Sequence, residues 1–313
     1  MKKFIRYTLI FSLSWLLLGI LFEMTLRRIP NPYTFKKELF DRKAEAVKTL
    51  VIGSSVADYG INPAFLGDSA YSQAISGEWL KYNLASFEQY IDRMQHLRTV
   101  LLGVAYQALW MENDFREATP ANMLRKAEQR IYRGIRLDNN PIYEIECIQS
   151  IPTARSKWIK YYVLRQPTVH CDSLGFDHID ALSEREDNWQ EWRNVVKMHT
   201  ADLQSADGKE AYHQSCLCIE QIAHLCKEKR AHLYLVVLPT HQLYYEHVDK
   251  TQLRMMYDAL QQIAMKCDNV SILDYFDDKR FEDDDFHDVN HLSDVGAEKF
   301  TRMLIDENNS ILQ

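Results

Sequence analysis

An acid and a histidine stand three residues apart near the end of the chain, in a polar turn that precedes a helical stretch. They are Asp288 and His291. In nucleophilic hydrolysis a histidine takes the proton of the nucleophile, and a carboxylate holds the imidazole in the required tautomer. A serine must complete the set, and Ser55 is the candidate, because it follows an apolar run that ends in Gly53. We therefore predict a catalytic triad of Ser55, His291 and Asp288.

Short apolar runs that alternate with helical stretches must position these residues. We expect buried strands at residues 47–53, 72–76, 99–104, 232–238 and 270–273, and helices over 78–96, 212–226, 251–266 and from 293 onward. A repeated order of strand, crossover helix and strand is typical of a doubly wound, mostly parallel α/β sheet. Ser55 then lies at the carboxyl end of the first strand, the edge at which open α/β sheets bind ligands.

The N-terminus has the pattern of a membrane anchor. Three basic residues within the first six precede an apolar run over residues 7–22, which is about long enough to cross a bilayer. No small-residue cleavage site follows, so we favour an uncleaved signal anchor over 1–28 rather than a cleaved signal peptide or a buried helix of a soluble protein. Basic residues flank both ends of the run and do not settle its orientation. We expect a connector over 29–46 and a single-pass protein of the inner (cytoplasmic) membrane, with its catalytic domain outside the cytoplasm.

Residues 107–206 interrupt the α/β pattern. A helix is expected from Thr119 to about residue 134, with a proline in its first turn. The rest is polar and aromatic with little periodicity, and we interpret the segment as a largely helical insertion or lid that shapes a substrate groove within an α/β domain of residues 47–313. Trp189 and Trp192 would share a helix face, where they either stack on a sugar ring or cover the core.

The serine and histidine blocks resemble those of the SGNH (GDSL-like) hydrolase superfamily. Gly53-Ser54-Ser55 matches the block in which the family's serine follows the first strand, with Ser54 where aspartate is usual. Asp288-Val289-Asn290-His291 matches the block before the last helix. The resemblance covers about residues 46–308 and is to the membrane-anchored bacterial type. It implies a flavodoxin-like sheet and makes Ser55, rather than the rival Ser54, the nucleophile; Asn290 is interpreted as a turn residue.

The family surrounds the developing oxyanion with three donors: the N–H of the serine, a glycine N–H and an asparagine side chain. The resemblance gives the first role to Ser55 and the second to Gly77, which follows the second strand. After the strand at 99–104 no asparagine stands, and Gln107 or Tyr106 is the substitute donor. Loss of one donor typically costs about 100- to 1000-fold in rate, so full hydrolytic competence depends on this substitute.

The loop after the fourth strand reaches the same edge of the sheet. Thr240 and His241, which follow Pro239 there, are candidates for contact with substrate. An ordinary strand-to-helix loop explains these two residues equally well.

Composition argues against several other classes of function. The chain of 313 residues has a net charge of −7, which is unlike a general nucleic-acid binder. Its six cysteines form no Cys-x-x-Cys pair, and the His287-Asp288 pair lacks the upstream histidines of a metal phosphohydrolase, so we expect no metal and no cofactor. Eight acids between residues 274 and 288 fit either a calcium loop or, as we favour, a solvated acidic turn.

The resemblance and the anchor together imply an expected function. It is that of a serine esterase or O-acyltransferase acting on acyl esters, with acetyl as the expected group, of a cell-envelope or surface polysaccharide. A membrane acyltransferase is a candidate partner. The alternative is a catalytically degenerate member that keeps the fold as a glycan-binding or assembly partner at the membrane. The missing asparagine and the Gly-Ser-Ser variant favour this alternative.

Overall fold

The computed structural model describes residues 1–313 except 112–118, 138, 180–191 and 313. Trp189 therefore lies outside the described residues. The chain divides into two compact units. The anchor unit consists of Met1–Phe35 with Ala118–Val169, and the sheet unit consists of Lys36–Glu117 with His170–Gln313.

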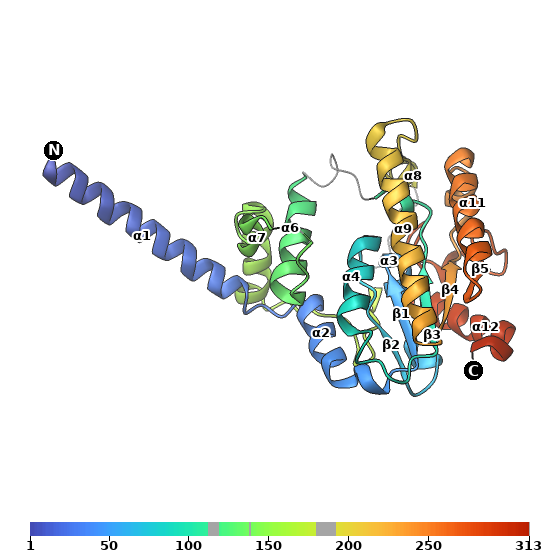
Figure 1. Ribbon diagram of the computed structural model, residues 1–313. Helices are drawn as coiled ribbons and strands as arrows, with labels where there is room; N and C mark the ends of the chain where they lie inside the picture. Colours follow the sequence, from blue (N-terminus) through green and yellow to red (C-terminus); the bar gives the residue numbers. More distant parts are fainter. Residues whose placement is uncertain (112–118, 138, 180–191, 313) are drawn as a thin grey trace. The chain divides into compact units, whose positions relative to one another are not determined.

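The sheet unit is built on five parallel strands in the order β2-β1-β3-β4-β5 (Figure 1). The strands are β1 (Thr49–Gly53), β2 (Ala70–Ser72), β3 (Thr99–Gly103), β4 (His232–Val237) and β5 (Val270–Asp274). All of β3 is buried, and so is β4 after its first residue. Strands covered on both faces favour continuous apolar sequence, which these two strands have. The predicted parallel α/β sheet is confirmed.

Helices cover both faces of this sheet. From β1 the chain moves to the edge strand β2 through α3 (Ser55–Gly60), and every later crossover runs in the opposite direction. These crossovers contain α4 (Leu80–Tyr90), α9 (Ala206–Glu228) and α11 (Lys250–Lys266). Because such connections are right-handed, the reversal places α3 on the other face. The contacts agree, since α9 packs on both α4 and α11, and α12 (Asp294–Leu312) packs on α3. The sheet is doubly wound, with its switch point between β1 and β3.

The remaining described helices precede β1 or are further helices within the connections between strands. They are α1 (Lys2–Leu26), α2 (Pro32–Lys43), α6 (Pro120–Glu128), α7 (Ile151–Trp158), α8 (Trp192–His199) and α10 (Gln242–Tyr245). Single π turns extend α6 over Gln129–Arg133 and α7 over Ile159–Val163. Short 3-10 turns lie at Ala44–Ala46, Pro63–Phe65, Ala108–Trp110, Pro141–Glu144 and Asp283–Asp285.

Strand β2 begins and ends earlier than the sequence predicts. Its regular pairing with β1 stops at Ser72, whereas the apolar pattern indicated 72–76. The following residues still bond the neighbouring strand: the Gln73 N–H donates to the Val51 carbonyl at 2.8 Å, and the Ile75 N–H donates to Gly53 at 3.3 Å. The chain therefore runs along β1 up to the turn that holds Gly77.

In the anchor unit, α1 is 25 residues long and exposes most of its apolar side chains. At 1.5 Å per residue it is about 37 Å long, and by length and composition it can cross a membrane. The predicted helix after Thr119 is also present. Its cap is the Thr119 side chain, which accepts the Asn122 N–H at 3.4 Å, and Gly134 ends the stretch in the left-handed conformation, with φ 76°.

Candidate active site

Ser55 is placed at the carboxyl edge of the sheet by a tight strand-to-helix turn. Gly53 ends β1 with φ 140°, and Ser55 is the first residue of α3. A side chain at Gly53 would meet the Gly103 carbonyl oxygen at 2.8 Å and the Ala57 side chain at 2.9 Å. Only glycine lets α3 approach the ends of β1 and β3 so closely. The Ser55 side chain therefore starts from the switch point of the sheet, where such folds bind ligands.

Asp288 and His291 lie in a short loop that its own hydrogen bonds close. The His287 N–H donates to the His291 carbonyl at 3.0 Å. One oxygen of Asp288, Oδ1, accepts the N–H groups of Asn290 and His291, each at 2.9 Å. An aspartate that binds the backbone just ahead of it in this way forms an Asx turn. This turn fixes the carboxylate beside the imidazole before any substrate binds.

Two hydrogen bonds join the three predicted catalytic side chains. Oδ2 of Asp288 lies 2.8 Å from Nδ1 of His291, and Nε2 of His291 lies 2.7 Å from Oγ of Ser55. A carboxylate only accepts, so Nδ1 carries the proton and Nε2 accepts from the serine hydroxyl. This is the tautomer that a general base needs. The Tyr59 ring stands edge-on to the imidazole at 5.5 Å between centroids and supports its orientation. The structure thus brings the three side chains together; their catalytic roles remain predictions.

The carboxyl group of Asp288 is held ionised. Burial by itself raises its pKa, but the charge of His291, the bond to its ring and the two backbone donors outweigh burial and lower the pKa to about 2. A carboxylate that stays charged stabilises the imidazolium that forms when His291 takes a proton. The electrostatics therefore favour proton transfer from Ser55 to His291.

A buried ion pair ties the turn that carries Gly77 to α3. Asp58, on α3, accepts the Ser76 N–H at 2.8 Å, and Lys36 donates both to Asp58 and, at 2.7 Å, to the Ala74 carbonyl. Lys36 and Asp58 are only 2 % and 1 % exposed. Burial raises the pKa of Asp58 to about 7, against the pull of the Lys36 charge. Gly77 itself has φ 70°, and donation of its N–H toward Ser55 remains a prediction.

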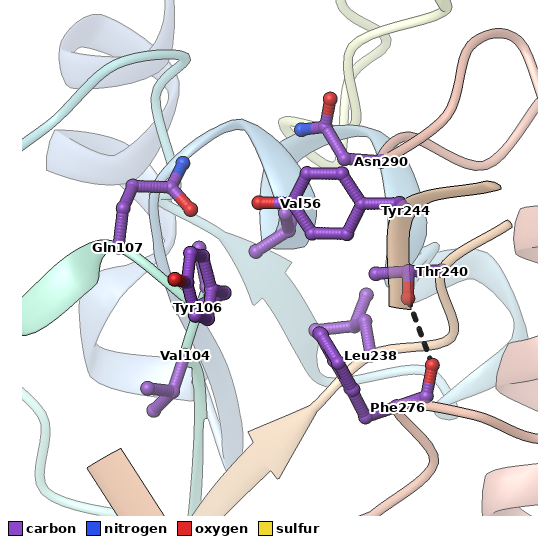
Figure 2. A pocket seen from close by; sticks show the side chains of 10 residues that line it. Val56, Val104, Tyr106, Gln107, Leu238, Thr240, Tyr244, Phe276 and Asn290 are labelled. Atoms are coloured by element: carbon purple, nitrogen blue, oxygen red, sulfur yellow. Dashed lines mark hydrogen bonds between the residues drawn. The ribbon is translucent and has the colours of Figure 1, made fainter. Parts of the chain in front are cut away.

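Two side-chain amides lie near the triad. Gln107 follows β3 and is 6 % exposed, and its amide has no hydrogen-bond partner within the part of the chain that the structure describes. Nδ2 of Asn290 lies 3.2 Å from Nε2 of His291. Figure 2 shows the two amides on either side of Val56, the residue after Ser55. An amide group that makes no bond within the protein is free to donate to a ligand or to water. Donation from Gln107 to an oxyanion remains a prediction, and Asn290 lies in the Asx turn, as expected, with its amide beside His291.

A small cavity opens beside these amides (Figure 2). Its lining is mostly apolar and includes Val104, Leu238 and Phe276, together with Tyr106 and Tyr244. The space open to the centre of a water molecule is about 10 Å³, which corresponds to roughly one water. A methyl group fills about the same space.

The two residues proposed for substrate contact differ in position. Thr240 lines the cavity, although its hydroxyl already donates to the Phe276 carbonyl at 2.9 Å. Both ring nitrogens of His241 are engaged elsewhere: Nδ1 accepts the Leu243 N–H at 3.2 Å, and Nε2 lies 2.9 Å from an Asp283 oxygen. Contact with substrate remains a prediction for both residues, and only Thr240 lies on the cavity.

The acidic stretch over 274–288 uses several of its carboxylates within the protein. Asp278 pairs with Arg280, and Asp285 pairs with Lys299. Among the described residues, no group of three or more His, Cys, Asp and Glu side chains is arranged to hold a metal ion. None of the six cysteines forms a disulfide.

No family model matches the chain, and no curated protein matches it. A solved structure that is similar to it is described as "The structure of a putative platelet activating factor from Streptococcus pneumonia". The match has 12% sequence identity and a TM-score of 0.44, and it covers 98% of this chain and 99% of the other.

Proposed function

We propose that this protein is a membrane-anchored serine esterase or O-acyltransferase of SGNH type. The observation that supports this most strongly is the hydrogen-bonded series Asp288, His291 and Ser55 at the switch point of the sheet. A buried amide and a small apolar cavity lie beside it. A serine hydroxyl is inert without a base, and here the base is in contact with it.

In the first half of the proposed reaction, Oγ of Ser55 attacks the ester carbonyl carbon while its proton passes to Nε2 of His291. The carbonyl oxygen takes the negative charge. The N–H groups of Ser55 and Gly77 and the Gln107 amide are the proposed donors to it, with Asn290 as a further one. The ester C–O bond then breaks, and His291 returns the proton to the leaving alkoxide. The acyl group is now bound to Ser55.

In the second half, water or a sugar hydroxyl takes the place of the leaving alcohol. His291 removes its proton as it attacks the acyl-enzyme, and the proton then returns to Oγ of Ser55 as that bond breaks. With water the product is a free acid and the enzyme is an esterase. With a sugar hydroxyl the product is a new ester and the enzyme is an O-acyltransferase.

The substrate that we propose is an acetyl ester on a cell-envelope or surface polysaccharide. The size of the cavity supports acetyl, since its space matches one methyl group. The polysaccharide, and a membrane acyltransferase as a possible donor of the acyl group, rest on the anchor and on the family resemblance.

We also propose that α1 spans the inner membrane once and that the sheet unit lies outside the cytoplasm. The full-length chain should remain in the membrane fraction. Protease added outside the inner membrane should digest the region after residue 30. A soluble cytosolic chain would contradict this topology.

A fluorophosphonate probe tests the proposed function, because it reacts covalently with an activated serine. The wild-type chain should be labelled on Ser55, whereas Ser55→Ala and His291→Ala chains that still fold should not. An unlabelled wild type would instead support the degenerate alternative, a glycan-binding or assembly partner. Residues 103–107 contain no asparagine, the residue that supplies the family's third oxyanion donor, and this absence favours that alternative.

A further inference from the structure

In the anchor unit, α7 is fixed to the last turns of α1. The indole N–H of Trp158 donates to the Thr25 hydroxyl at 3.0 Å, and the Tyr162 hydroxyl donates to the Thr25 carbonyl at 3.0 Å. The rings of Trp158 and Phe22 lie 6.5 Å apart. Leu26 and Ala154 are buried in the same small cluster. If α1 crosses a bilayer, α7 therefore lies at the level where α1 leaves it (Figure 1).

Exposed apolar side chains are concentrated in the same unit. After α1, twelve large hydrophobic side chains are exposed among the described residues, and eight of them lie between residues 137 and 164. They are Leu137, Ile142, Ile145, Ile148, Ile151, Ile159, Val163 and Leu164. The much larger sheet unit has only four. Single exposed apolar residues are normal, whereas a concentration of them marks an interaction surface.

The charge of the chain is divided between its two units. The anchor unit has 14 Lys and Arg against 5 Asp and Glu, a formal net charge of +9, and the sheet unit has 23 against 39, a net charge of −16. An anionic surface therefore attracts the anchor unit and repels the sheet unit.

Cations and aromatic rings accompany the exposed apolar residues on α7 and its π turn. Arg155, Lys160 and Arg165 are exposed, and within the described part of the chain none of the three has an ion-pair partner. Trp158 and Tyr161 are partly buried beside them. Residues 151–165 contain four basic residues and no acid. Helices that lie in a lipid–water interface combine apolar, aromatic and basic residues in this way.

We propose that α7 and its π turn, residues 151–165, rest in the lipid–water interface of the membrane that α1 enters. Ile151, Ile159, Val163 and Leu164 would enter the boundary of the acyl chains. Arg155, Lys160 and Arg165 would bind anionic phosphate headgroups. The occupant of this surface is lipid. The surface is continuous with the apolar surface of α1, and its positive charge complements anionic headgroups. This inference does not depend on the proposed esterase activity.

Photo-crosslinking of the full-length chain tests the proposal. Benzoylphenylalanine is placed at Val163, with Met24 in α1 as the membrane reference and Met265 in α11, which is 79% exposed, as the control. The chain is reconstituted in vesicles of phosphatidylethanolamine and phosphatidylglycerol, illuminated, and analysed by mass spectrometry. Phospholipid adducts at Val163 should come within a few-fold of those at Met24 and exceed those at Met265 at least tenfold. Adducts at Val163 as low as at Met265 would overturn the proposal.

Two further measurements separate lipid from other occupants. In intact cells, Val163 should cross-link to lipid. A cross-link to a second copy, to another protein or to another part of the chain instead would overturn the assignment. In the vesicles, combined Arg155→Glu and Lys160→Glu should lower the lipid adducts at Val163 several-fold. Combined Lys209→Glu and Arg254→Glu, which reverse two exposed cations of the sheet unit, should not. Unchanged adducts in the first double variant would exclude recognition of an anionic surface.

Discussion

Asp288→Asn tests the proposed tautomer of His291 with almost no change of shape. In the wild type, Oδ1 of Asp288 binds two backbone N–H groups and Oδ2 faces Nδ1 of His291. In the variant, the amide oxygen is expected to keep the two backbone donors. The NH₂ group then faces Nδ1, and two donors cannot bond each other. The imidazole must therefore present Nε2–H to Ser55, and it can no longer accept the serine proton.

The size of the effect follows from two losses. A mismatched buried donor costs about 1–3 kcal/mol. The lost attraction between Asp288 and the imidazolium is about 4 kcal/mol at 4 Å with an effective dielectric constant of about 20, and less here because the Asp288 side chain is 32% exposed. If screening reduces the second loss to about 3 kcal/mol, the two losses together give about 4–6 kcal/mol, so kcat should fall by about 10³- to 10⁴-fold.

Steady-state hydrolysis of 4-nitrophenyl acetate measures the effect, with folding checked by circular dichroism. Asp294→Asn is the matched control, because Asp294 makes a similar contact to a histidine, 2.7 Å to Nδ1 of His178, outside the triad. It should keep kcat within a few-fold of the wild type. If Asp288→Asn retains more than a tenth of the wild-type kcat, the tautomer reasoning is wrong. An equal loss in Asp294→Asn would assign the effect to general destabilisation.

Three other changes have expected outcomes. Gln107→Ala and Asn290→Ala should each lower kcat by about 10- to 1000-fold with little change in KM, because an oxyanion donor acts mainly in the transition state. A rise in KM of similar size at constant kcat would point to a role in substrate binding instead. Since the folded pKa of Asp288 is lowered from 3.8 to about 2, its contribution to stability is present above pH 4 and lost as pH falls toward 2. The difference in unfolding free energy between the wild type and Asp288→Asn, measured by urea denaturation in detergent, should therefore shrink by up to about 2 kcal/mol over that interval. Val104→Ala should raise the kcat/KM ratio of butyryl to acetyl esters by about tenfold, because it enlarges the cavity; an unchanged ratio would remove the cavity from the acyl site.

The sheet could be predicted from local patterns, and the proximity of Ser55 to His291 could be predicted from the place of each block in the chain and from the family resemblance; the catalytic roles remain predictions. An apolar run that ends in glycine indicates a buried strand and its turn, and the order of such runs gave the doubly wound sheet. Asp288 and His291 are close in sequence, and an Asx turn needs only their spacing. Ser55 was recognised from its place at the end of β1.

Other parts of the site depend on contacts that only the fold creates. Lys36 and Asp58 are 22 positions apart, and the Lys36 side chain on α2 reaches Asp58 on α3 only in the folded chain. Asn290 is the turn residue that was expected, but its side-chain contact with Nε2 of His291 could not be predicted from the sequence. Gln107 was indicated only by its place after β3. Likewise, no periodicity shows that Ala118–Val169 packs with Met1–Phe35; the predicted boundaries at residues 28 and 46 remain predictions.

The most direct test of the central claim is to identify the atom that carries the acyl group during turnover. The full-length chain is mixed with 4-nitrophenyl acetate, quenched in acid within the first turnover and digested, and the peptide that contains Ser54 and Ser55 is sequenced by mass spectrometry. We predict one acetyl group on Ser55, none on Ser54, and none on either residue in the His291→Ala chain. Ester turnover with no acetyl group on Ser55, or with the group on Ser54, would contradict the proposed mechanism.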